Sequence, residues 1–258
     1  MTLSVGLIDS GLGSLVFSSF FYASLDNKIA VNFKHFSNVS GGPVGSQSDA
    51  FLHAESEMLL QKMQEEKCDV NVIACNTLSC FIKRENIVVP GCINLFDLTQ
   101  KMATSIASSN QSGPCMLLST CNTRNFGMYT NIFQAAMPAT KIINSTLTNK
   151  CIAYLEGADE YAKAAEDEVI KIAQYAQQQN CQAIVLLCTH YPMFANTIKQ
   201  HFSGQIVMQH LYFKYFINTK GLPLGNANFF IKDRSINREA ASHVIKSAGL
   251  TSDILHFG

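Results

Sequence analysis

Short apolar runs alternate along the chain with longer segments in which apolar residues recur at helical spacing. Apolar runs typical of strands lie at 3–8, 70–74 and 183–187. Two segments, 51–66 and 161–177, place their apolar residues on one helical face. Strands and helices that alternate in this way are typical of parallel sheets covered by helices. The pattern therefore predicts an α/β fold.

The same order of elements occurs twice. Further strands are predicted at 29–36, 114–119 and 141–147, and the strands that end at Cys75 and Cys188 each follow a long amphipathic helix. We therefore expect two similar α/β lobes with mainly parallel sheets flanked by helices, related by a pseudo-two-fold axis. The active site would lie in the cleft between them.

The end of the chain is expected to return to the first lobe, because 239–248 has the pattern of one more covering helix. The predicted first lobe comprises 1–97 and 206–258, with Asp9 and Cys75, and the second comprises 98–205, with Thr120 and Cys188.

Composition removes several classes of function. The chain has 258 residues, with 19 Lys and Arg against 19 Asp and Glu, so its formal net charge is zero. Nucleic-acid binding usually needs a clearly basic surface, and we expect no such partner. No apolar run approaches the roughly 18 residues of a membrane span, so no membrane partner is expected either.

Nine cysteines are distributed through the chain, several of them inside apolar runs. The number is odd, and the first residues lack the basic and apolar regions of a secretory signal. A reducing compartment with free thiols fits this pattern better than a disulfide framework. We therefore expect a cytoplasmic protein.

Polar side chains follow the predicted strands at the point where each strand ends. Ligand sites of parallel sheets lie beyond the carboxyl ends of the strands. If two lobes face each other across a cleft, each presents one thiol to a shared ligand. The segments concerned are Asp9-Ser10, Cys75-Asn76-Thr77, Thr120 to Thr123 and Cys188-Thr189-His190.

Each of these residues also has an ordinary structural explanation. A cysteine that ends an apolar strand is usually a small core residue. His190 alone is more often a hydrogen-bonded structural histidine than a catalyst, and Asp9 and the threonines are suitable helix caps. Their matching topological positions favour function. The core explanation is kept for Cys68, Cys80, Cys92, Cys115, Cys151 and Cys181.

Four motifs together carry a family resemblance. With IDSGLGSL, ACNTLS, LLSTCNTRNFGMY and LLCTHYP in this order, the chain resembles the glutamate racemases of the cofactor-independent aspartate/glutamate racemase superfamily. Racemisation removes the α-proton from one face of an amino acid and returns it on the other. The resemblance implies that Cys75 and Cys188 are the two groups that do so, the first serving the D-enantiomer and the second the L-enantiomer. A thiol, with a pKa of about 8.5, is suited to such a step.

The resemblance also implies helpers around the two thiols. Asp9 matches the acid near the first thiol and His190 the group near the second. Glu156 is the best match to a further acid, with Glu160 as the alternative. Neutral donors would bind the amino and carboxylate groups of a small amino-acid substrate, glutamate or aspartate. Those positions are Ser10, Asn76, Thr77, Thr120, Thr123 and Thr189, with the loop Pro43, Val44 and Gly45.

The chain departs from the family pattern at several positions. Val44 stands where the family has a tyrosine, and Asn38 stands where it has an acid, which leaves the choice between glutamate and aspartate open. Ser14 replaces the second glycine of a usual pair. The strand before QHLYFKYF lacks the Asp-Ser that normally follows it, and the aromatic residues there suit either the core or an oligomer contact.

Two other classes of function remain possible at this point. In a thiol hydrolase, Cys188 would be the nucleophile and His190 its base, since residues two apart on a strand point to the same face. A non-catalytic relative would bind an amino acid or a protein partner. Under the racemase hypothesis no cofactor or metal is expected, and the sequence has no P-loop or metal-ligand spacing. A homodimer is possible, and in a bacterium D-glutamate would supply peptidoglycan.

Overall fold

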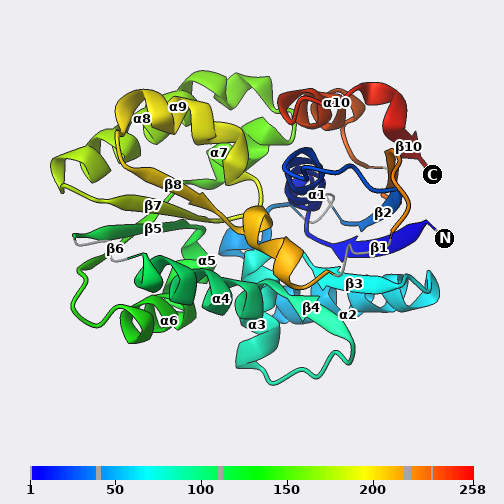
Figure 1. Cartoon of the computed structure of the whole chain (residues 1–258), viewed down its shortest axis with the longest axis horizontal. Helices are drawn as coiled ribbons and strands as arrows, with labels where there is room; N and C mark the ends of the chain where they lie inside the picture. The colour runs from blue at the N-terminus through cyan, green and yellow to red at the C-terminus, as the bar shows by residue number, and fades with distance from the viewer. Residues whose placement is uncertain (1, 39–41, 110–112, 218–221, 234) are drawn as a thin grey trace.

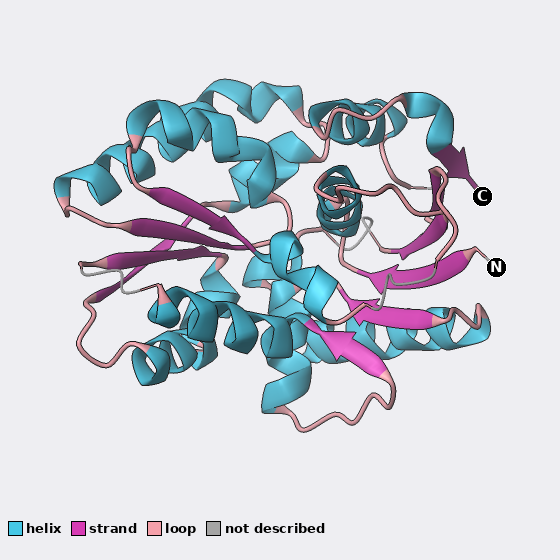
Figure 2. Cartoon of the chain, viewed as in Figure 1, coloured by secondary structure: helices cyan, strands magenta, loops and turns pink. Residues whose placement is uncertain are grey.

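The structure is a computed structural model that describes residues 2–38, 42–109, 113–217, 222–233 and 235–258. It consists of two parallel sheets flanked by helices, as Figures 1 and 2 show. The α/β fold class expected from the sequence is confirmed.

The first sheet has the strand order β10-β9-β2-β1-β3-β4, and every pair of neighbouring strands is parallel. Its strands are β1 (Leu3–Ile8), β2 (Val31–Phe36), β3 (Val70–Ile73), β4 (Cys92–Asn94), β9 (Ala227–Ile231) and β10 (Leu255–Phe257). The helices beside it are α1 (Gly13–Ala23), α2 (Asp49–Glu65), α3 (Asn76–Arg84) and α10 (Arg238–Ser247) (Figure 1).

The second sheet has the order β6-β5-β7-β8 and is also parallel throughout. Its strands are β5 (Cys115–Ser119), β6 (Ile142–Thr146), β7 (Ala183–Leu187) and β8 (Gln205–Met208). The helices beside it are α4 (Leu95–Ser108), α5 (Cys121–Asn125), α6 (Met128–Ala136), α7 (Asn149–Leu155), α8 (Ala162–Gln178) and α9 (Ala195–His201). Short 3₁₀ turns are η2 (Val44–Ser46), η3 (Asp159–Tyr161), η4 (Tyr191–Phe194), η5 (Gln209–Tyr215) and η6 (Ser252–Ile254).

The position of β8 shows where the chain leaves the second sheet and returns to the first. The expected return at 206 falls inside β8, which pairs with β7 in register Ala183 to Gln205. Consequently, the chain leaves the second sheet only after Met208. The division into two lobes stays a prediction, with β8 on the side of the second.

Aromatic packing joins η5 to the first sheet's helices. Phe213 is fully buried, and its ring lies 5.2 Å from that of Phe17 and 4.9 Å from that of Phe21, both on α1. Tyr215, two residues further on, is 59% exposed. The aromatic segment is therefore core at Phe213 and surface at Tyr215. Edge-to-face pairs of this kind add about 0.5–1.5 kcal/mol each beyond their buried area.

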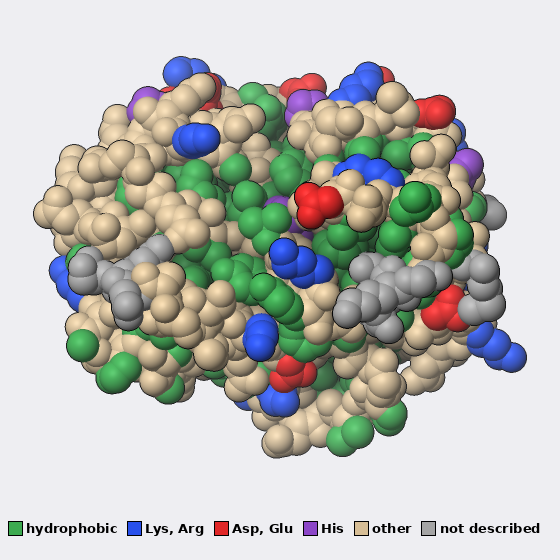
Figure 3. Space-filling view, viewed as in Figure 1, with side chains coloured by type: hydrophobic (Ala, Val, Ile, Leu, Met, Phe, Trp, Pro, Cys, Tyr) green, Lys and Arg blue, Asp and Glu red, His purple; other side chains and the backbone are tan. Residues whose placement is uncertain are grey.

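Charged side chains are scattered over the face shown in Figure 3, with both signs interspersed. Among the described residues, no helix is both long and apolar enough to cross a membrane.

Candidate active site

The carboxyl ends of β1, β3, β5 and β7 converge on one narrow cavity of about 20 Å³. It is lined by residues from loops that follow all four strands, and most of them are buried. The lining residues are Asp9, Ser10, Pro43, Val44, Gly45, Cys75, Asn76, Thr77, Thr120, Ile152, Cys188, Thr189 and His190. The structure thus brings together both thiols and nearly all of the residues expected to serve them.

Thr123 and Glu156 lie directly behind this lining, within hydrogen-bonding distance of Thr120 and His190 respectively. Ile152, by contrast, lines the cavity but was not expected from the sequence. Its place on the apolar face of α7 is typical of a core residue, so the pattern carried no signal of a site.

The first thiol stands at the start of α3. Cys75 follows β3, and its sulfur interacts with the Asp9 carboxylate and the backbone N–H of Leu78. Burial and the Asp9 carboxylate raise the pKa of the Cys75 thiol well above its ordinary value. The helix N-terminus and the Leu78 N–H act in the opposite direction, because they stabilise a thiolate.

Asp9 is buried at the end of β1 with its carboxylate fully engaged. Its Oδ1 accepts from the backbone N–H of Ser10 at 2.7 Å, and its Oδ2 accepts from the Thr189 hydroxyl at 3.2 Å. Burial raises the pKa of Asp9 to about 6, although the charge on His190 and the Ser10 N–H oppose the rise. The group can therefore gain or lose a proton near neutral pH.

The second thiol is followed by a charged pair. Nδ1 of His190 lies 3.8 Å from the Cys188 sulfur, and its Nε2 lies 2.7 Å from Oε1 of Glu156. Burial opposes a charge on the imidazole. The hydrogen bonds with Cys188 and Glu156 nonetheless raise the pKa of His190 well above its ordinary value. A protonated His190 thus faces the sulfur of Cys188.

The turn after β7 corrects one sequence expectation. The prediction that Cys188 and His190 share one face of a strand is wrong, because β7 ends at Leu187 and the next residues form a turn. The two side chains meet through the turn instead.

Of the two candidate acids, Glu156 lies beside His190 and Glu160 does not. Glu156 is 15% exposed and accepts from His190 and from the backbone N–H of Leu12, which lies 3.0 Å from the same oxygen. Glu160 lies in η3 and is exposed. Because Leu12 precedes α1 and Glu156 ends α7, the carboxylate connects helices that belong to the two sheets.

Two glycines in the DSGLG segment leave room for these side chains. A Cβ on Gly13 would lie 2.7 Å from Nδ1 of His190 and would also overlap Oδ2 of Asp9 and the Thr189 hydroxyl. A Cβ on Gly11 would overlap the Glu156 carboxylate. Real Cβ atoms do not approach other atoms this closely, so any larger residue must displace the site.

Three hydroxyls form a closed triangle on the opposite wall. Thr77 lies 3.0 Å from Thr120 and 3.2 Å from Thr123, and those two are 2.9 Å apart. All three are buried. Hydroxyls can reorient, so this wall can donate hydrogen bonds to an anionic ligand without placing a fixed charge there.

The loop with Pro43, Val44 and Gly45 closes another side of the cavity. The Asn122 amide donates to the carbonyls of Val44 at 3.1 Å and Gln47 at 2.8 Å, which holds η2 in place. Val44 is buried. Asn38, where the family has an acid, donates instead to Oε2 of the buried Glu55 at 2.9 Å, away from the cavity lining. The expected loop is thus present, with an apolar side chain at its tip.

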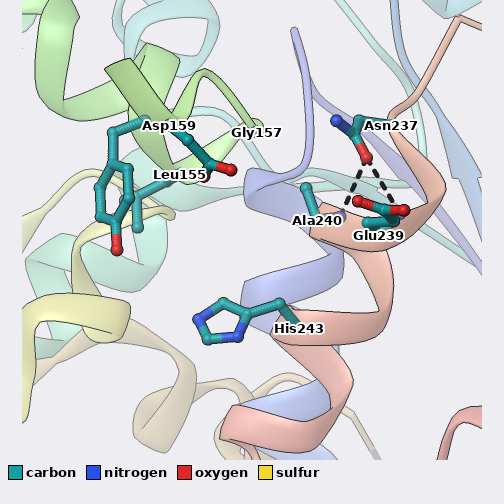
Figure 4. A pocket seen from close by; sticks show the side chains of 8 residues that line it. Leu155, Gly157, Asp159, Asn237, Glu239, Ala240 and His243 are labelled. Carbon is teal, nitrogen blue, oxygen red and sulfur yellow. Dashed lines mark hydrogen bonds between the residues drawn. The ribbon is translucent and has the colours of Figure 1, made fainter. Parts of the chain in front are cut away.

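A second cavity lies beside Glu156 along the chain. It has about 200 Å³ and is lined by Leu155, Gly157 and Asp159 on one side and by Asn237, Ala240 and His243 of the α10 region on the other. Figure 4 shows the two groups facing each other. It contains neither thiol.

Known proteins with similar sequences are glutamate racemases. No family model matches the chain. The glutamate racemase of Corynebacterium glutamicum is 24% identical over 202 residues, which cover 76% of this chain and 69% of that protein. The glutamate racemase of a Thermoanaerobacter species is 25% identical over 207 residues, covering 76% and 71% respectively.

Solved structures agree over the full length. Glutamate racemase from Francisella tularensis, in complex with D-glutamate, superposes with a TM-score of 0.73 at 18% identity, covering 100% of this chain and 97% of that one. An isoform from Bacillus anthracis gives 0.74 at 16% identity, covering 99% and 96%. Allantoin racemase from Klebsiella pneumoniae gives 0.52 at 12% identity, covering 82% and 84%.

The structural matches show that the chain has the fold of the glutamate racemases. The sequence matches, at 24% and 25% identity, add a distant similarity to the glutamate racemases. The proteins to which it is similar are enzymes of the isomerase class.

Proposed function

We propose that the protein interconverts L- and D-glutamate by a two-thiol proton transfer without a cofactor. The observation that carries the proposal is the convergence of Cys75 and Cys188, from strands of two different sheets, on one buried cavity. Each thiol has its own titratable partner, Asp9 for the first and His190 for the second.

The partners favour different protonation states of the two thiols. Cys188 faces a protonated His190, which suits it to the role of the base, whereas Cys75 faces the Asp9 carboxylate and a raised pKa keeps it a thiol. One base and one acid therefore coexist in the same cavity, as a two-base mechanism requires.

The reaction from L-glutamate is then balanced. The Cys188 thiolate takes the α-proton and becomes a thiol, while the electron pair stays on the α-carbon. The Cys75 thiol gives its proton to the opposite face of that carbon and becomes a thiolate. The product is the D-enantiomer, and the net charge of the site is unchanged.

Binding would use the neutral donors that line the cavity. The hydroxyls of Thr77, Thr120 and Thr123 suit a carboxylate, and Asp9 with the Ser10 and Thr189 side chains suits the amino group. If the chain comes from a bacterium, the D-glutamate formed would supply peptidoglycan synthesis. A homodimer stays a prediction.

A second substrate is favoured by the apolar part of the cavity. Val44 and Ile152 both line it. An apolar wall of this kind gives a side-chain carboxylate few partners, which favours a less acidic substrate of the superfamily. Aspartate, which carries the same group as glutamate, stays an alternative on the family resemblance alone.

Exchange of the α-proton in deuterated buffer tests the proposal. L-Glutamate, L-aspartate and allantoin are offered separately to the reduced, folded protein with no cofactor, and NMR and chiral chromatography follow the products. Exchange of L-glutamate with accumulation of D-glutamate is expected. Exchange of only one of the other compounds would identify that compound as the substrate instead. If none of the three compounds exchanged its α-proton, a racemase acting on them would be contradicted.

A further inference from the structure

A buried cluster of polar side chains lies behind Asn76, outside the cavity. It contains Thr99 on α4, Tyr129 on α6 and Gln209 at the start of η5. All are almost fully buried: Thr99 0%, Tyr129 2% and Gln209 3% exposed. The cluster connects Asn76, the third residue after β3 of the first sheet, with Gln209, the residue directly after β8 of the second.

The carboxamide groups of Asn76 and Gln209 form a reciprocal pair. Nδ2 of Asn76 donates to Oε1 of Gln209 at 2.8 Å, and Nε2 of Gln209 donates to Oδ1 of Asn76 at 2.7 Å. Such a pair alone would be equally good with both amides turned over, since nitrogen and oxygen simply exchange places. Its orientation must be fixed from outside.

Thr99 supplies that orientation. Its hydroxyl donates to the carbonyl of Leu95 at 2.7 Å, and a carbonyl oxygen can only accept. With its hydrogen used there, Oγ1 of Thr99 must accept from the group 2.8 Å away on Gln209, which is therefore the Nε2 end. This assigns Oε1 of Gln209 as the acceptor for Asn76.

The orientation of Asn76 follows. Its Oδ1 accepts both from Gln209 and from the Tyr129 hydroxyl at 2.8 Å, which uses the two lone pairs of that oxygen. Its Nδ2 uses one hydrogen on Gln209. Within the described part of the chain, the second hydrogen has no partner, while Asn76 itself lines the cavity between Cys75 and Thr77. The amide can thus donate to a ligand and cannot accept from one.

We propose that Gln209 is a positioning residue that holds Asn76 with one N–H available to a carboxylate oxygen of the substrate. The inference rests on the proposed function and deepens it, because it assigns this part of the cavity to an anionic acceptor. The substrate's ammonium group would find no acceptor at Asn76. It would have to bind elsewhere in the cavity, where Asp9 is the acidic residue.

A double-mutant cycle tests the coupling. The KM for L-glutamate is measured in Gln209→Leu, Asn76→Ala and the double variant. Each single change is expected to raise KM about tenfold, the weight of one hydrogen bond to a charged group. Because Gln209 acts through Asn76, the double variant should match Asn76→Ala alone. An increase of about a hundredfold, the product of the two, would overturn the proposal.

Thr99→Val is the milder variant should Gln209→Leu unfold. It removes the hydroxyl that orients Gln209 and is expected to raise KM several-fold without a large change in kcat. Thr104→Val is its matched control, since Thr104 is exposed on the same helix and makes the same kind of hydroxyl bond, to Gln100 at 3.0 Å. An equal effect of the two changes would contradict the assigned role.

The side-chain amide of Asn76 gives a readout that needs no turnover. In ¹⁵N-labelled protein its two amide protons should differ, one protected by Gln209 and one shifted by added D-glutamate. In Gln209→Leu both should exchange rapidly. An unchanged Asn76 signal in that variant would overturn the positioning role even in an active enzyme. An inactive wild type with the expected Asn76 signals would count against the proposed function alone.

Discussion

Oε1 of Glu156 lies 2.7 Å from Nε2 of His190, although one residue ends α7 and the other follows β7. The same oxygen accepts from the backbone N–H of Leu12, beside α1. The acid that keeps the imidazole charged therefore depends on contacts from both sheets. A single carboxylate therefore joins the imidazole beside the second thiol to the segment that leads into α1.

Removing the negative charge of Glu156 should lower the activity that depends on Cys188. In Glu156→Gln the pKa of His190 should fall, because the carboxylate that helps to hold its proton is gone. We expect kcat/KM for L-glutamate to drop by about 10²-fold, the usual effect of losing a proton-transfer partner. Kinetics of Glu160→Gln, an exposed acid nearby, serve as the control and should match the wild type. Equal activity of both variants would contradict the role of Glu156.

Each thiol should be indispensable for racemisation. We expect Cys75→Ser and Cys188→Ser each to lower the rate by more than about 10³-fold, because a serine hydroxyl is far less acidic than a thiol. Cys121→Ser, at an exposed cysteine, is the control. Loss of activity only at Cys188 would instead favour a single-nucleophile mechanism, as in a thiol hydrolase.

Asp9 should make stability depend on pH in an unusual direction. Its folded pKa is raised from 3.8 to about 6, so the folded state binds more protons than the unfolded state between these values. Its contribution is present in full below pH 3.8 and is lost as pH rises through about 6. The lost free energy of unfolding is at most about 3 kcal/mol.

Chemical denaturation of the wild type and Asp9→Asn at several pH values measures this effect. Relative to the variant, the wild type should become less stable between about pH 4 and 6. Asp9→Asn should also lose most racemase activity. A stability difference that does not change with pH would contradict the buried, titrating carboxyl.

His35 should limit stability in acid. It is buried between the hydroxyls of Ser14 at 3.1 Å and Ser18 at 3.4 Å, and burial lowers its pKa from 6.5 to about 3. Its neutral form contributes stability that is complete above pH 6.5 and is lost as pH falls towards 3, up to about 5 kcal/mol. His35→Asn should flatten this part of the pH profile of unfolding, and His53→Asn, at an exposed histidine, should not. If the wild type and His35→Asn lost stability in acid to the same extent, His35 would not be the group responsible.

Replacing Gly13 should lower the activity of the protein but leave its stability nearly unchanged. In Gly13→Ala the new Cβ would displace Asp9, Thr189 or His190, so we expect activity to fall by about 10²-fold or more. Alanine also favours the helix by about 1 kcal/mol, which offsets part of the strain. Thermal unfolding should therefore change little. Gly258→Ala, where the nearest atoms are 3.9 Å away, is the control for both measurements.

The sequence was informative where local pattern decides structure. The strand 183–187 was predicted with its exact bounds, and helices near 51–66 and 161–177 appear as α2 and α8 with ends moved by one or two residues. The residues that follow β1, β3, β5 and β7 could be anticipated because the carboxyl ends of parallel strands meet at one edge. Glu156 and the loop from Pro43 to Gly45 were expected only from the family resemblance.

Side chains from elements far apart in the sequence were not predictable in the same way. Ile152 and Tyr129 have the pattern of ordinary core positions on helices, and only the packing of the two sheets brings them to the site. Likewise, Gln209 gains its role from a partner 133 positions away. The pairing of β8 with β7 was missed because the expected boundary rested on residues after the strand rather than on its own short apolar run.

The narrow cavity also governs where the transferred hydrogen comes from. The two sulfurs lie on buried residues, 5% exposed for Cys75 and 7% for Cys188, so we expect a thiol proton to exchange with bulk water more slowly than that of an exposed thiol. A hydrogen delivered in the first turnover should then be one acquired before the substrate entered. Enzyme equilibrated in heavy water and mixed rapidly into ordinary water with substrate would place deuterium in its first product. The isotope in the first product would thus report the solvent in which the enzyme was equilibrated before mixing, and later products would report the new solvent.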